Sequence, residues 1–427
     1  MKKVKSLITV AMFLVSLVVI SSVSAADIHV YSGQSIQSAI NAANPGDTIY
    51  VHAGTYNENL TIKNKNLTLI GDGASVTIID GSGSADNVIE VDGVVVNISG
   101  FTIRNGGNNG IYYRNGASGT ISNNIITGNT NKGIHVFGSS VTVAHNTIAN
   151  NNAEGIYLYN CTNCVIDGNV IHDNDVIHAG ILLNSCTTIE VANNNIYNEA
   201  YGIFLWDSDN NTLYNNSIHD NGHGIWIDGN SPNNKILKNN IRNNTESVDS
   251  GIHIALGSDP SGTEIHYNTI VENTRSESGY VGYVVSFGIF NETTEIVDAT
   301  MNWWGDNSGP YDPSLGAPDY NPNGRGDAVS DYVIYRPWTI RVTANPIAAF
   351  MPVKNYHLRQ VNTCLECIEE NLPEDVPEDV QALLDEMQEH IDNANTTGNS
   401  IYANNELLKA LKCAEEIEEK LDITCPL

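Results

Sequence analysis

A glycine–isoleucine pair recurs through the middle of this chain at intervals of 22 to 37 residues, and this repeat limits the folds open to it. The glycines are Gly110, Gly133, Gly155, Gly180, Gly202, Gly224, Gly251 and Gly288. An Asn-x-Ile series runs in phase with them, and its asparagines are Asn124, Asn146, Asn169, Asn194, Asn216, Asn239 and Asn268. Three residues after each of those isoleucines stands another asparagine, except in one turn, where the residue is Glu199. Repeats in phase over seven turns indicate a solenoid, in which each unit stacks on the next.

The repeating unit carries the pattern of short strands. In "GIYLY", from Gly155, and "GIFLW", from Gly202, inward apolar residues alternate with outward ones, as in a β-strand. The strands are separated by corners rich in asparagine and glycine, which tolerate left-handed backbone angles. A unit this short cannot pair with itself, so it pairs with its neighbours in parallel, about 4.8 Å apart. We predict an all-β parallel β-helix with the asparagines stacked in a column and Ile126 to Ile241 buried beside it.

The two ends of the repeat carry different sequence. "SIQSAINAANPGD", from Ser35, places Ile36 and Ile40 on one helical face and stops at Pro45, which predicts an N-terminal capping helix. The repeat breaks down at "MNWWGDNSGPYDP", and the later Arg-Gly-Asp tripeptide that ends at Asp327 is interpreted as a turn. We therefore expect the β-helix to span residues 27–343, with a linker at 344–353.

Residues 354–427 form a different kind of sequence, acidic and with apolar residues at helical spacing. This pattern predicts three helices at about 355–371, 377–394 and 400–422, in a small bundle. Such a bundle suits docking to a partner or to the cell envelope, and it equally suits a stabilising cap.

The first 25 residues predict secretion. Lys2, Lys3 and Lys5 precede an apolar run over residues 7–20, and small residues at 23–25 follow, as in a signal peptide. No other run is long enough to cross a membrane, so the mature chain is expected outside the cytoplasm or on the cell surface. The formal charge is −29, or −29 − 3 = −32 without the signal lysines, which argues against nucleic acid as a partner.

Several stretches resemble a known family. "SIQSAINAANPGDTIYVHAGTYNENLTI", "ISGFTIRNGG" and the "GIYLYN" type of turn are similar to right-handed parallel β-helix proteins of the pectin-lyase-like group, which includes NosD-like repeats and carbohydrate-binding and sugar-hydrolase members. The resemblance covers roughly residues 27–343. It implies the fold. Because lyases, hydrolases, epimerases, esterases and non-enzymatic surface proteins share that fold, it leaves the function open.

A stripe of aromatic residues follows the glycines. If the first and third residues after each glycine fill the core, the second and fourth face outward. Flat rings at steps of about 4.8 Å stack on sugars, and carboxylates accept sugar hydroxyls. The alternatives are that the rings only stabilise neighbouring turns, or that other segments cover them. The predicted ligand-binding residues are Tyr157, Tyr159, Phe204, Trp206, Asp207, Trp226 and Asp228.

A compact polar stretch offers weaker catalytic candidates: His219, Asp220 and His223. "NGHG" is similar to the Gly-His-Gly of polygalacturonase-type β-helix hydrolases, but the preceding turn lacks their paired aspartates. Glycoside hydrolysis requires two carboxylates about the scissile bond, and no pair stands out here. The polar residues also fall at corner positions of the repeat, which favours a structural role.

The cysteines form two groups. Cys161 and Cys186 lie at equivalent positions of adjacent turns, which predicts a disulfide, with Cys164 left over or pairing with Cys161 instead. The second group is Cys364, Cys367, Cys413 and Cys425. Its spacing fits no ordinary zinc ribbon, so two disulfides are favoured over a zinc site.

These observations favour a secreted or cell-surface protein that binds carbohydrate, or another surface polymer or envelope component, without catalysis. One alternative is a polysaccharide lyase, glycoside hydrolase or epimerase, and another is a purely structural or adhesive protein. Only 20 lysines and arginines occur in the chain, which argues against an anionic polysaccharide more than against a neutral glycan. No cofactor is firmly implied, and calcium is the one left open.

Overall fold

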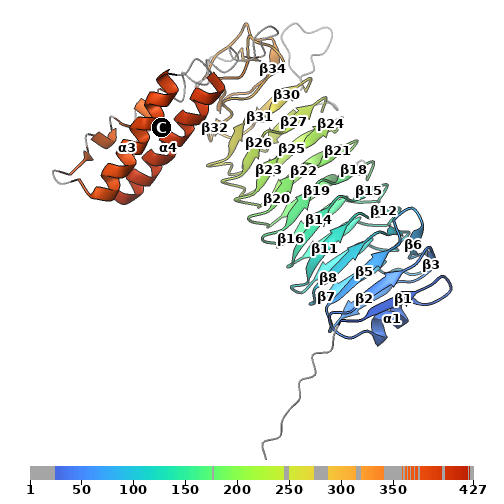
Figure 1. The fold of residues 1–427 in the computed structure, drawn as a ribbon. Helices are drawn as coiled ribbons and strands as arrows, with labels where there is room; N and C mark the ends of the chain where they lie inside the picture. Colours follow the sequence, from blue (N-terminus) through green and yellow to red (C-terminus); the bar gives the residue numbers. More distant parts are fainter. Residues whose placement is uncertain are drawn as a thin grey trace, which may run out of the picture.

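The computed structural model describes residues 25–175, 177–244, 250–273, 287–313, 319–340 and, with short gaps, residues 358–423. The predicted signal peptide and linker lie outside the described residues, except that Ala25 is included. The described chain is an elongated coil of short parallel strands, with α1 at its first turn and two longer helices after the last (Figure 1). This confirms the predicted all-β parallel β-helix with a small helical C-terminal region.

Three parallel sheets run along the coil, and each turn visits them in the same order. The first contains β1 (Asp27–Val30), β2 (Thr48–Val51), β5 (Leu67–Gly71), β8 (Val96–Ser99), β11 (Ser118–Ser122), β14 (Ser140–Ala144), β17 (Val165–Asp167), β20 (Glu190–Ala192), β23 (Thr212–Tyr214), β26 (Lys235–Leu237), β29 (Glu264–His266), β32 (Val297–Asp298) and β35 (Val333–Ile334). The second contains β4 (Leu60–Lys63), β7 (Ile89–Asp92), β10 (Ile111–Arg114), β13 (Ile134–Phe137), β16 (Ile156–Tyr159), β19 (Ala179–Asn184), β22 (Tyr201–Trp206), β25 (His223–Asp228), β28 (Ser250–Ile254) and β31 (Phe287–Asn291). The third contains β3 (Gly54–Tyr56), β6 (Thr77–Asp80), β9 (Thr102–Arg104), β12 (Ile125–Thr127), β15 (Thr147–Ala149), β18 (Val170–His172), β21 (Asn195–Tyr197), β24 (Ser217–His219), β27 (Asn240–Arg242) and β30 (Thr269–Val271).

The strands pair in register, so equivalent residues of successive turns form straight rows. Ile156 of β16 lies beside Ile181 of β19, which lies beside Ile203 of β22. The residues one and three positions after each repeat glycine point inward and are fully buried, as predicted. The Asn-x-Ile isoleucines from Ile126 to Ile241 are also fully buried. Aliphatic rows of this kind supply the hydrophobic stabilisation of the coil.

Two asparagine columns close two of the corners. In the first asparagine column, which runs from Asn124 through Asn146, Asn169, Asn194, Asn216, Asn239 and Asn268 to Asn302, each side-chain oxygen accepts from the preceding turn. The second runs from Asn129 through Asn151, Asn174, Glu199, Asn221, Asn244 and Asn273 to Asp327. The predicted column is therefore confirmed.

The corner geometry explains the polar residues beside the columns. Asp173 and Asp220, which precede members of the second column, have φ of 52° and 57°. Asparagine and aspartate adopt this left-handed region more readily than other residues with a side chain. The turn it makes directs the next side chain into the coil, where Asn174 and Asn221 join the column. The left-handed backbone conformation of this corner therefore explains the aspartate at position 220.

The N-terminal cap forms as predicted, with Ile36 and Ile40 of α1 (Ile36–Ala42) buried on the first turns. Ser35 is the N-cap, and Glu58 accepts hydrogen bonds from the backbone N–H groups of Ile36 (2.8 Å) and Gln37 (3.0 Å). At the other end of α1, Lys65 Nζ donates to the carbonyl of Ala43 (2.7 Å). Opposite charges at the two ends of a helix stabilise it and fix it on the coil.

The closing element terminates both columns. Asn302, from the "MNWWGDNSGP" stretch, ends the first column by accepting from Asn268, and Trp304 beside it is fully buried. Asp327 ends the second by accepting from the backbone and side chain of Asn273, both at 2.8 Å. Asp327 is the middle residue of β34 (Gly326–Ala328), which pairs with β33 (Pro310–Tyr311). The Arg-Gly-Asp tripeptide is therefore part of the closing structure, and its last two residues lie in a strand and not in the predicted turn.

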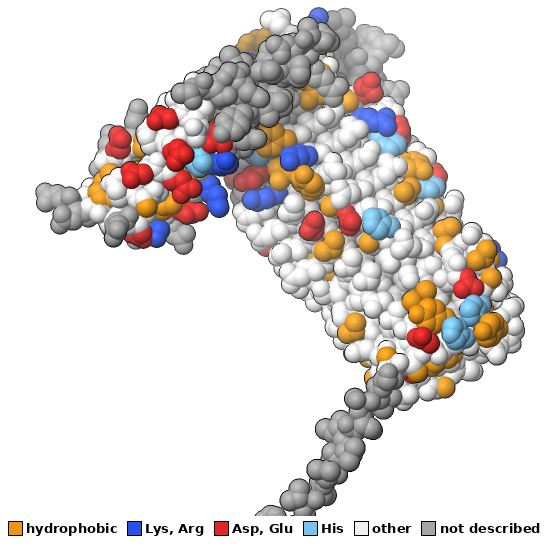
Figure 2. Space-filling view, in the orientation of Figure 1, with side chains coloured by type: hydrophobic (Ala, Val, Ile, Leu, Met, Phe, Trp, Pro, Cys, Tyr) orange, Lys and Arg blue, Asp and Glu red, His pale blue; other side chains and the backbone are white. Residues whose placement is uncertain are grey.

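Two helices of the C-terminal region pack against each other, α3 (Glu378–Thr396) and α4 (Ser400–Leu421), close to two of the predicted ranges. Of the predicted helix at 355–371, only some residues are described, and those from 358 onward are helical. The shared core includes Val380, Met387, Leu407 and Ile417. Acidic side chains gather on these helices, while the visible face of the coil is mostly uncharged (Figure 2). Within the described residues, none of the helices has the length and apolarity that crossing a membrane requires.

The predicted disulfide between Cys161 and Cys186 is wrong, because both are buried free thiols. In-register parallel neighbours project their Cβ atoms in the same direction, so these atoms stay about 4.8 Å apart, as far as the strands themselves. A disulfide needs Cβ atoms about 3.8 Å apart. Each thiol instead donates to two carbonyls, those of Leu158 (3.4 Å) and Asn184 (3.3 Å) for Cys186. The hydrogen bond to Cys161 and burial raise the pKa of the Cys186 thiol.

In the C-terminal group, Cys364 and Cys413 are buried thiols that form no disulfide. Cys367 is disulfide-bonded, and Cys425 lies outside the described residues. One disulfide of this group is therefore present, at Cys367, and the second predicted disulfide is wrong, because Cys364 and Cys413 pack as thiols into the helical core.

Replacing Cys186 with serine is expected to change the free energy of unfolding by less than about 1 kcal/mol. In the next turn Ser208 occupies the equivalent place, and its hydroxyl donates to two carbonyls in the same way. Denaturant titration without reductant measures the effect. A loss of about 2–5 kcal/mol would instead indicate that Cys186 forms a disulfide in the folded protein.

Candidate binding surface

The outer side of the second sheet carries a continuous surface of rings, which we call the aromatic face. One row of in-register residues contains Tyr112, His135, Tyr157, Leu182, Phe204, Trp226, His253 and Phe290. A second row, two residues further along each strand, contains Phe137, Tyr159, Asn184, Trp206 and Asp228. The predicted ligand-binding residues Tyr157, Tyr159, Phe204, Trp206, Trp226 and Asp228 therefore lie together on one sheet, and Asp207 directly follows β22.

Rings of the first row stack on one another. Ring centroids lie 4.7 Å apart for Tyr112 and His135 and 5.0 Å apart for His135 and Tyr157, with interplanar angles near 25°. Their neighbours half-bury these rings, and burial lowers the pKa of His135 to about 4. His135 is therefore neutral at physiological pH. Lys132 places its ammonium 5.1 Å from the Tyr157 ring centroid and forms an ion pair with Glu154 (3.3 Å).

The second row is more open. Tyr159 is 39% exposed and Trp206 is 46% exposed, whereas Tyr157, Phe204 and Trp226 are half-buried. Trp206 stacks on Phe204 with centroids 5.9 Å apart, and Tyr159 stacks on Phe137 at 5.4 Å. The two exposed rings thus rest on half-buried ones, which limits their freedom. A ring held in this way loses little further entropy when a ligand stacks on it.

Trp226 is the centre of a tighter cluster. The His253 ring lies 4.0 Å from its centroid and His223 meets it edge-on at 4.5 Å, while Tyr201 stacks on His223 at 5.4 Å. Trp226 Nε1 is buried and has no hydrogen-bond partner among the described residues, so packing alone fixes the indole. His253 Nε2 is 3.2 Å from the carboxylate of Glu292.

The carboxylates on and beside the aromatic face are engaged by neighbouring groups. Glu90 and Asp92 both bind Arg114, at 2.8 and 2.9 Å. Asp207 accepts the backbone N–H of Asn230 (2.9 Å), and Asp228 accepts that of Gly229 (2.7 Å). Each aspartate retains oxygen lone pairs, so it can still accept a ligand hydroxyl.

The three catalytic candidates do not converge. His219 and Asp220 lie at the third sheet and its corner, where His219 Nδ1 contacts Asp220 Oδ2 at 2.6 Å and so lowers the pKa of that carboxyl. His219 also stacks on Tyr197 at 5.2 Å. His223 belongs to the second sheet, is buried and takes part in the Trp226 cluster. The polar stretch is thus divided between two faces of the coil.

Apart from His223, which was a catalytic candidate, sequence reasoning missed the residues that precede the repeat glycines. Lys132, Glu154, Tyr201 and His223 occupy this position and face outward with the aromatic rows. These residues lie three positions before the first row, so strict alternation along a strand would have placed them inside the coil and gave no signal for them. To the predicted surface they add one cation (Lys132), one acid (Glu154) and two polar rings (Tyr201 and His223).

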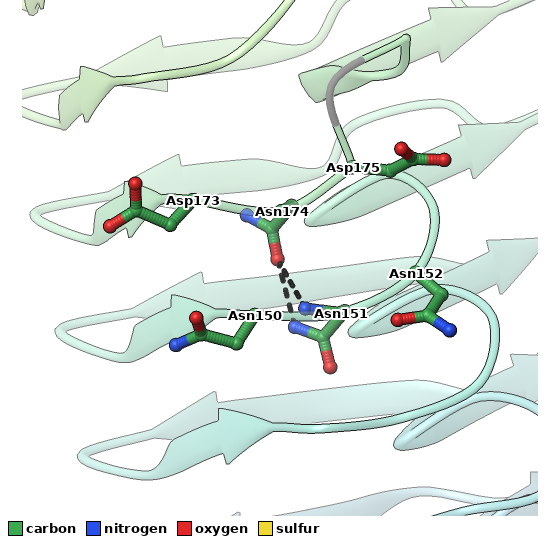
Figure 3. Close-up of a pocket in the computed structure, with 6 residues that line it drawn as sticks. All are labelled: Asn150, Asn151, Asn152, Asp173, Asn174 and Asp175. Carbon is green, nitrogen blue, oxygen red and sulfur yellow. Dashed lines mark hydrogen bonds between the residues drawn. The ribbon is translucent and has the colours of Figure 1, made fainter.

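A shallow pocket of about 470 Å³ lies at the second-column corner, lined by Asn150, Asn151, Asn152, Asp173, Asn174 and Asp175. Asp173 and Asp175 point away from each other on either side of Asn174 (Figure 3). Asp173 is held by His172 and Asn198, and Asp175 by His178. These carboxylates do not gather on one point as calcium ligands do.

Comparisons with known proteins agree with this architecture. The model described as "Right handed beta helix region" matches residues 87–198 and 133–295, and the "Pectinesterase" model matches residues 21–118. Pectinesterase 2 of Citrus sinensis is 34% identical over 107 residues, covering 19% of this chain and 21% of that protein. The chain thus spans about a fifth of the length of this curated relative.

Solved structures are similar to this chain at low identity. The A-module of mannuronan C-5 epimerase AlgE6 of Azotobacter vinelandii is 17% identical with a TM-score of 0.43, covering 70% of this chain and 93% of that chain. The enzymatically active domain of bacteriophage CBA120 tailspike protein 2 is 16% identical with a TM-score of 0.47, covering 76% and 53%.

The family assignment rests on the coil itself together with the matched family model. Three parallel sheets are visited in the same order in each turn, and two asparagine columns join the turns. The model for this fold matches residues 87–198 and 133–295. The chain is a member of the right-handed parallel β-helix family.

Proposed function

We propose that this protein is secreted or held at the cell surface and that its aromatic face binds a neutral carbohydrate chain without catalysis. The observation that carries the proposal is the outward, in-register arrangement of Tyr159 and Trp206, both exposed and both supported by half-buried rings. Turns about 4.8 Å apart present side chains at regular steps to an extended polymer lying along the coil. Ring faces stack on sugar rings, and Asp207 and Asp228 can accept hydroxyls at the margin.

Charge favours a neutral ligand. The chain has a formal net charge of −29, and such a charge repels polyanions. Two of the cations on or beside the aromatic face, Lys132 and Arg114, are paired with carboxylates. The match of residues 21–118 to the pectinesterase model supports carbohydrate as the ligand class, because a pectinesterase acts on a polysaccharide.

Replacing Trp206 with alanine is expected to weaken glycan binding about tenfold or more, a loss of about 1.4 kcal/mol or more. The free energy of unfolding should change by less than about 1 kcal/mol, because the ring is nearly half exposed and the inward Ile203 and Leu205 are untouched. A glycan array identifies the ligand, and calorimetry then compares the variants.

Tyr214→Ala is the matched control, because Tyr214 is 37% exposed on the first sheet, away from the aromatic face. It should leave binding unchanged. If Trp206→Ala lowers the melting temperature and leaves glycan binding intact, the ring only stabilises neighbouring turns, and the proposed surface is wrong.

The alternative is that the aromatic face catalyses a reaction of the carbohydrate that it binds. Two histidines, His223 and His253, meet beside Trp226, and His253 contacts Glu292. Such groups can exchange protons with a substrate. Reducing-sugar and unsaturated-uronate assays on each glycan that binds separate the two functions. Product formation that is lost in His223→Ala would establish catalysis.

A further inference from the structure

Three side chains of the helical region converge on one point. Glu386 and His390 lie one turn apart on α3, and Cys413 faces them from α4. One ligand atom from each residue lies within 4.8 Å of the others. Cys413 is only 6% exposed, while the Glu386 side chain is 60% exposed, so the point of convergence opens from the helix interface toward solvent.

A fourth residue orients the histidine. Glu406, buried on α4, contacts His390 Nδ1 through Oε2 at 2.8 Å, and its other oxygen accepts from Lys409 Nζ at 2.8 Å. With Nδ1 engaged, Nε2 is the atom that faces Glu386, at 3.8 Å from its Oε1. Metal-bound histidines commonly have a carboxylate on the second ring nitrogen, which fixes the ring and raises its basicity.

The donor set selects the metal. Sulfur, imidazole nitrogen and a single carboxylate suit zinc, whereas calcium and magnesium require oxygen ligands. Zinc–nitrogen and zinc–oxygen bonds of about 2.0–2.1 Å at a tetrahedral angle place the two ligand atoms about 3.3 Å apart. The 3.8 Å between His390 Nε2 and Glu386 Oε1 needs to shorten by only about half an ångström, which the exposed Glu386 side chain can supply.

We propose that Glu386, His390 and Cys413 bind a zinc ion between α3 and α4, with water as the fourth ligand. The ion would join the two helices where Glu386 is accessible from solvent. This proposal does not depend on carbohydrate binding by the coil. It also gives Cys413 a role as a thiol, in place of the disulfide that the sequence predicted.

The test is a cobalt titration of the full-length, metal-free protein. One equivalent of Co²⁺ should give a thiolate-to-cobalt charge-transfer band and the visible bands of a tetrahedral site. Cys413→Ser should abolish the charge-transfer band. Cys186→Ser, which removes a buried thiol of the coil, should retain it, with far-UV circular dichroism confirming that each variant is folded.

Zinc affinity, measured by competition with a chromophoric chelator, provides a second readout. Glu386→Gln should weaken binding at least tenfold, and it leaves the core untouched because Glu386 is exposed. Glu406→Gln should weaken it about 10–100-fold, as expected for an orienting carboxylate. Glu389→Gln, on an exposed residue of α3, should have no effect. The proposal is overturned if cobalt gives no charge-transfer band, if the band survives Cys413→Ser, or if Cys413 is disulfide-bonded in protein never exposed to reductant.

Discussion

Glu199→Gln is expected to make the protein more stable at alkaline pH, by up to about 4–5 kcal/mol relative to the wild type. Glu199 replaces asparagine in the second column and is buried, with Oε1 accepting from Asn174 Nδ2 at 2.7 Å. Burial raises the pKa of its carboxyl from 4.5 to about 8. Glutamine keeps the oxygen that accepts this hydrogen bond and cannot ionise.

The pH window follows from the direction of this shift. Above about pH 4.5 the unfolded chain loses the Glu199 proton, while the folded chain retains it until about pH 8. The stability contributed by the neutral acid is therefore complete at low pH, falls as pH rises between these values, and is fully lost above the folded pKa. The difference in unfolding free energy between variant and wild type should grow across that window.

Chemical denaturation at a series of pH values measures this difference. Glu190→Gln is the matched control, because Glu190 is exposed on β20 and belongs to neither column. It should follow the wild-type profile within about 0.5 kcal/mol. Parallel profiles for Glu199→Gln and wild type would show that the buried carboxyl is not held neutral.

Asn239→Ala is expected to lower the free energy of unfolding by about 3–5 kcal/mol. Its Oδ1 accepts from the backbone and side chain of Asn216, both at 2.9 Å, and its Nδ2 donates to Leu213 (2.9 Å) and Asn268 (3.1 Å). Alanine leaves the backbone N–H of Asn216 buried without an acceptor. Each buried group left unpaired costs about 1–3 kcal/mol.

The neighbouring Asn240→Ala provides the control, because Asn240 points outward from β27 and is partly exposed. It should cost less than about 0.5 kcal/mol. Hydrogen exchange adds a local readout, since protection should fall first at the turns on either side of Asn239. Equal effects from the two variants would mean that the column contributes little to stability.

The columns were predictable because the constraint behind them is local and repeated. The Asn-x-Ile pattern, for example Asn216 and Ile218, recurs in turn after turn. Alternation and stacking therefore assign the places of its residues without reference to other parts of the chain. The column ends were harder to predict. Asp327 is 54 residues from its partner Asn273, and the Asn-x-Ile series that aligns the other members does not continue between them.

The candidate sites were also predictable only in part, because contacts between turns and between helices do not follow from periodicity. Periodicity placed Trp206 and Trp226 on one outer face, but it did not indicate that Trp226 would be half-buried by rings from adjacent turns. Equivalent positions predicted that Cys161 and Cys186 would lie close, yet the direction of their Cβ atoms decides whether they can bond. The meeting of His390 with Cys413 depends on how two helices pair, which helical periodicity alone does not specify.

The closure of the second column by Asp327 has an electrostatic consequence. Every amide of the column donates toward the following turn, so the side-chain dipoles are aligned and add along the coil, as peptide dipoles add along a helix. The positive end of this array lies at the last turn, and there an anion is favoured. A carboxylate such as Asp327 suits that end because it only accepts, whereas the interior position of Glu199 favours the neutral acid. The aspartate of this Arg-Gly-Asp tripeptide therefore serves as the anionic end group of a row of dipoles and faces the protein interior.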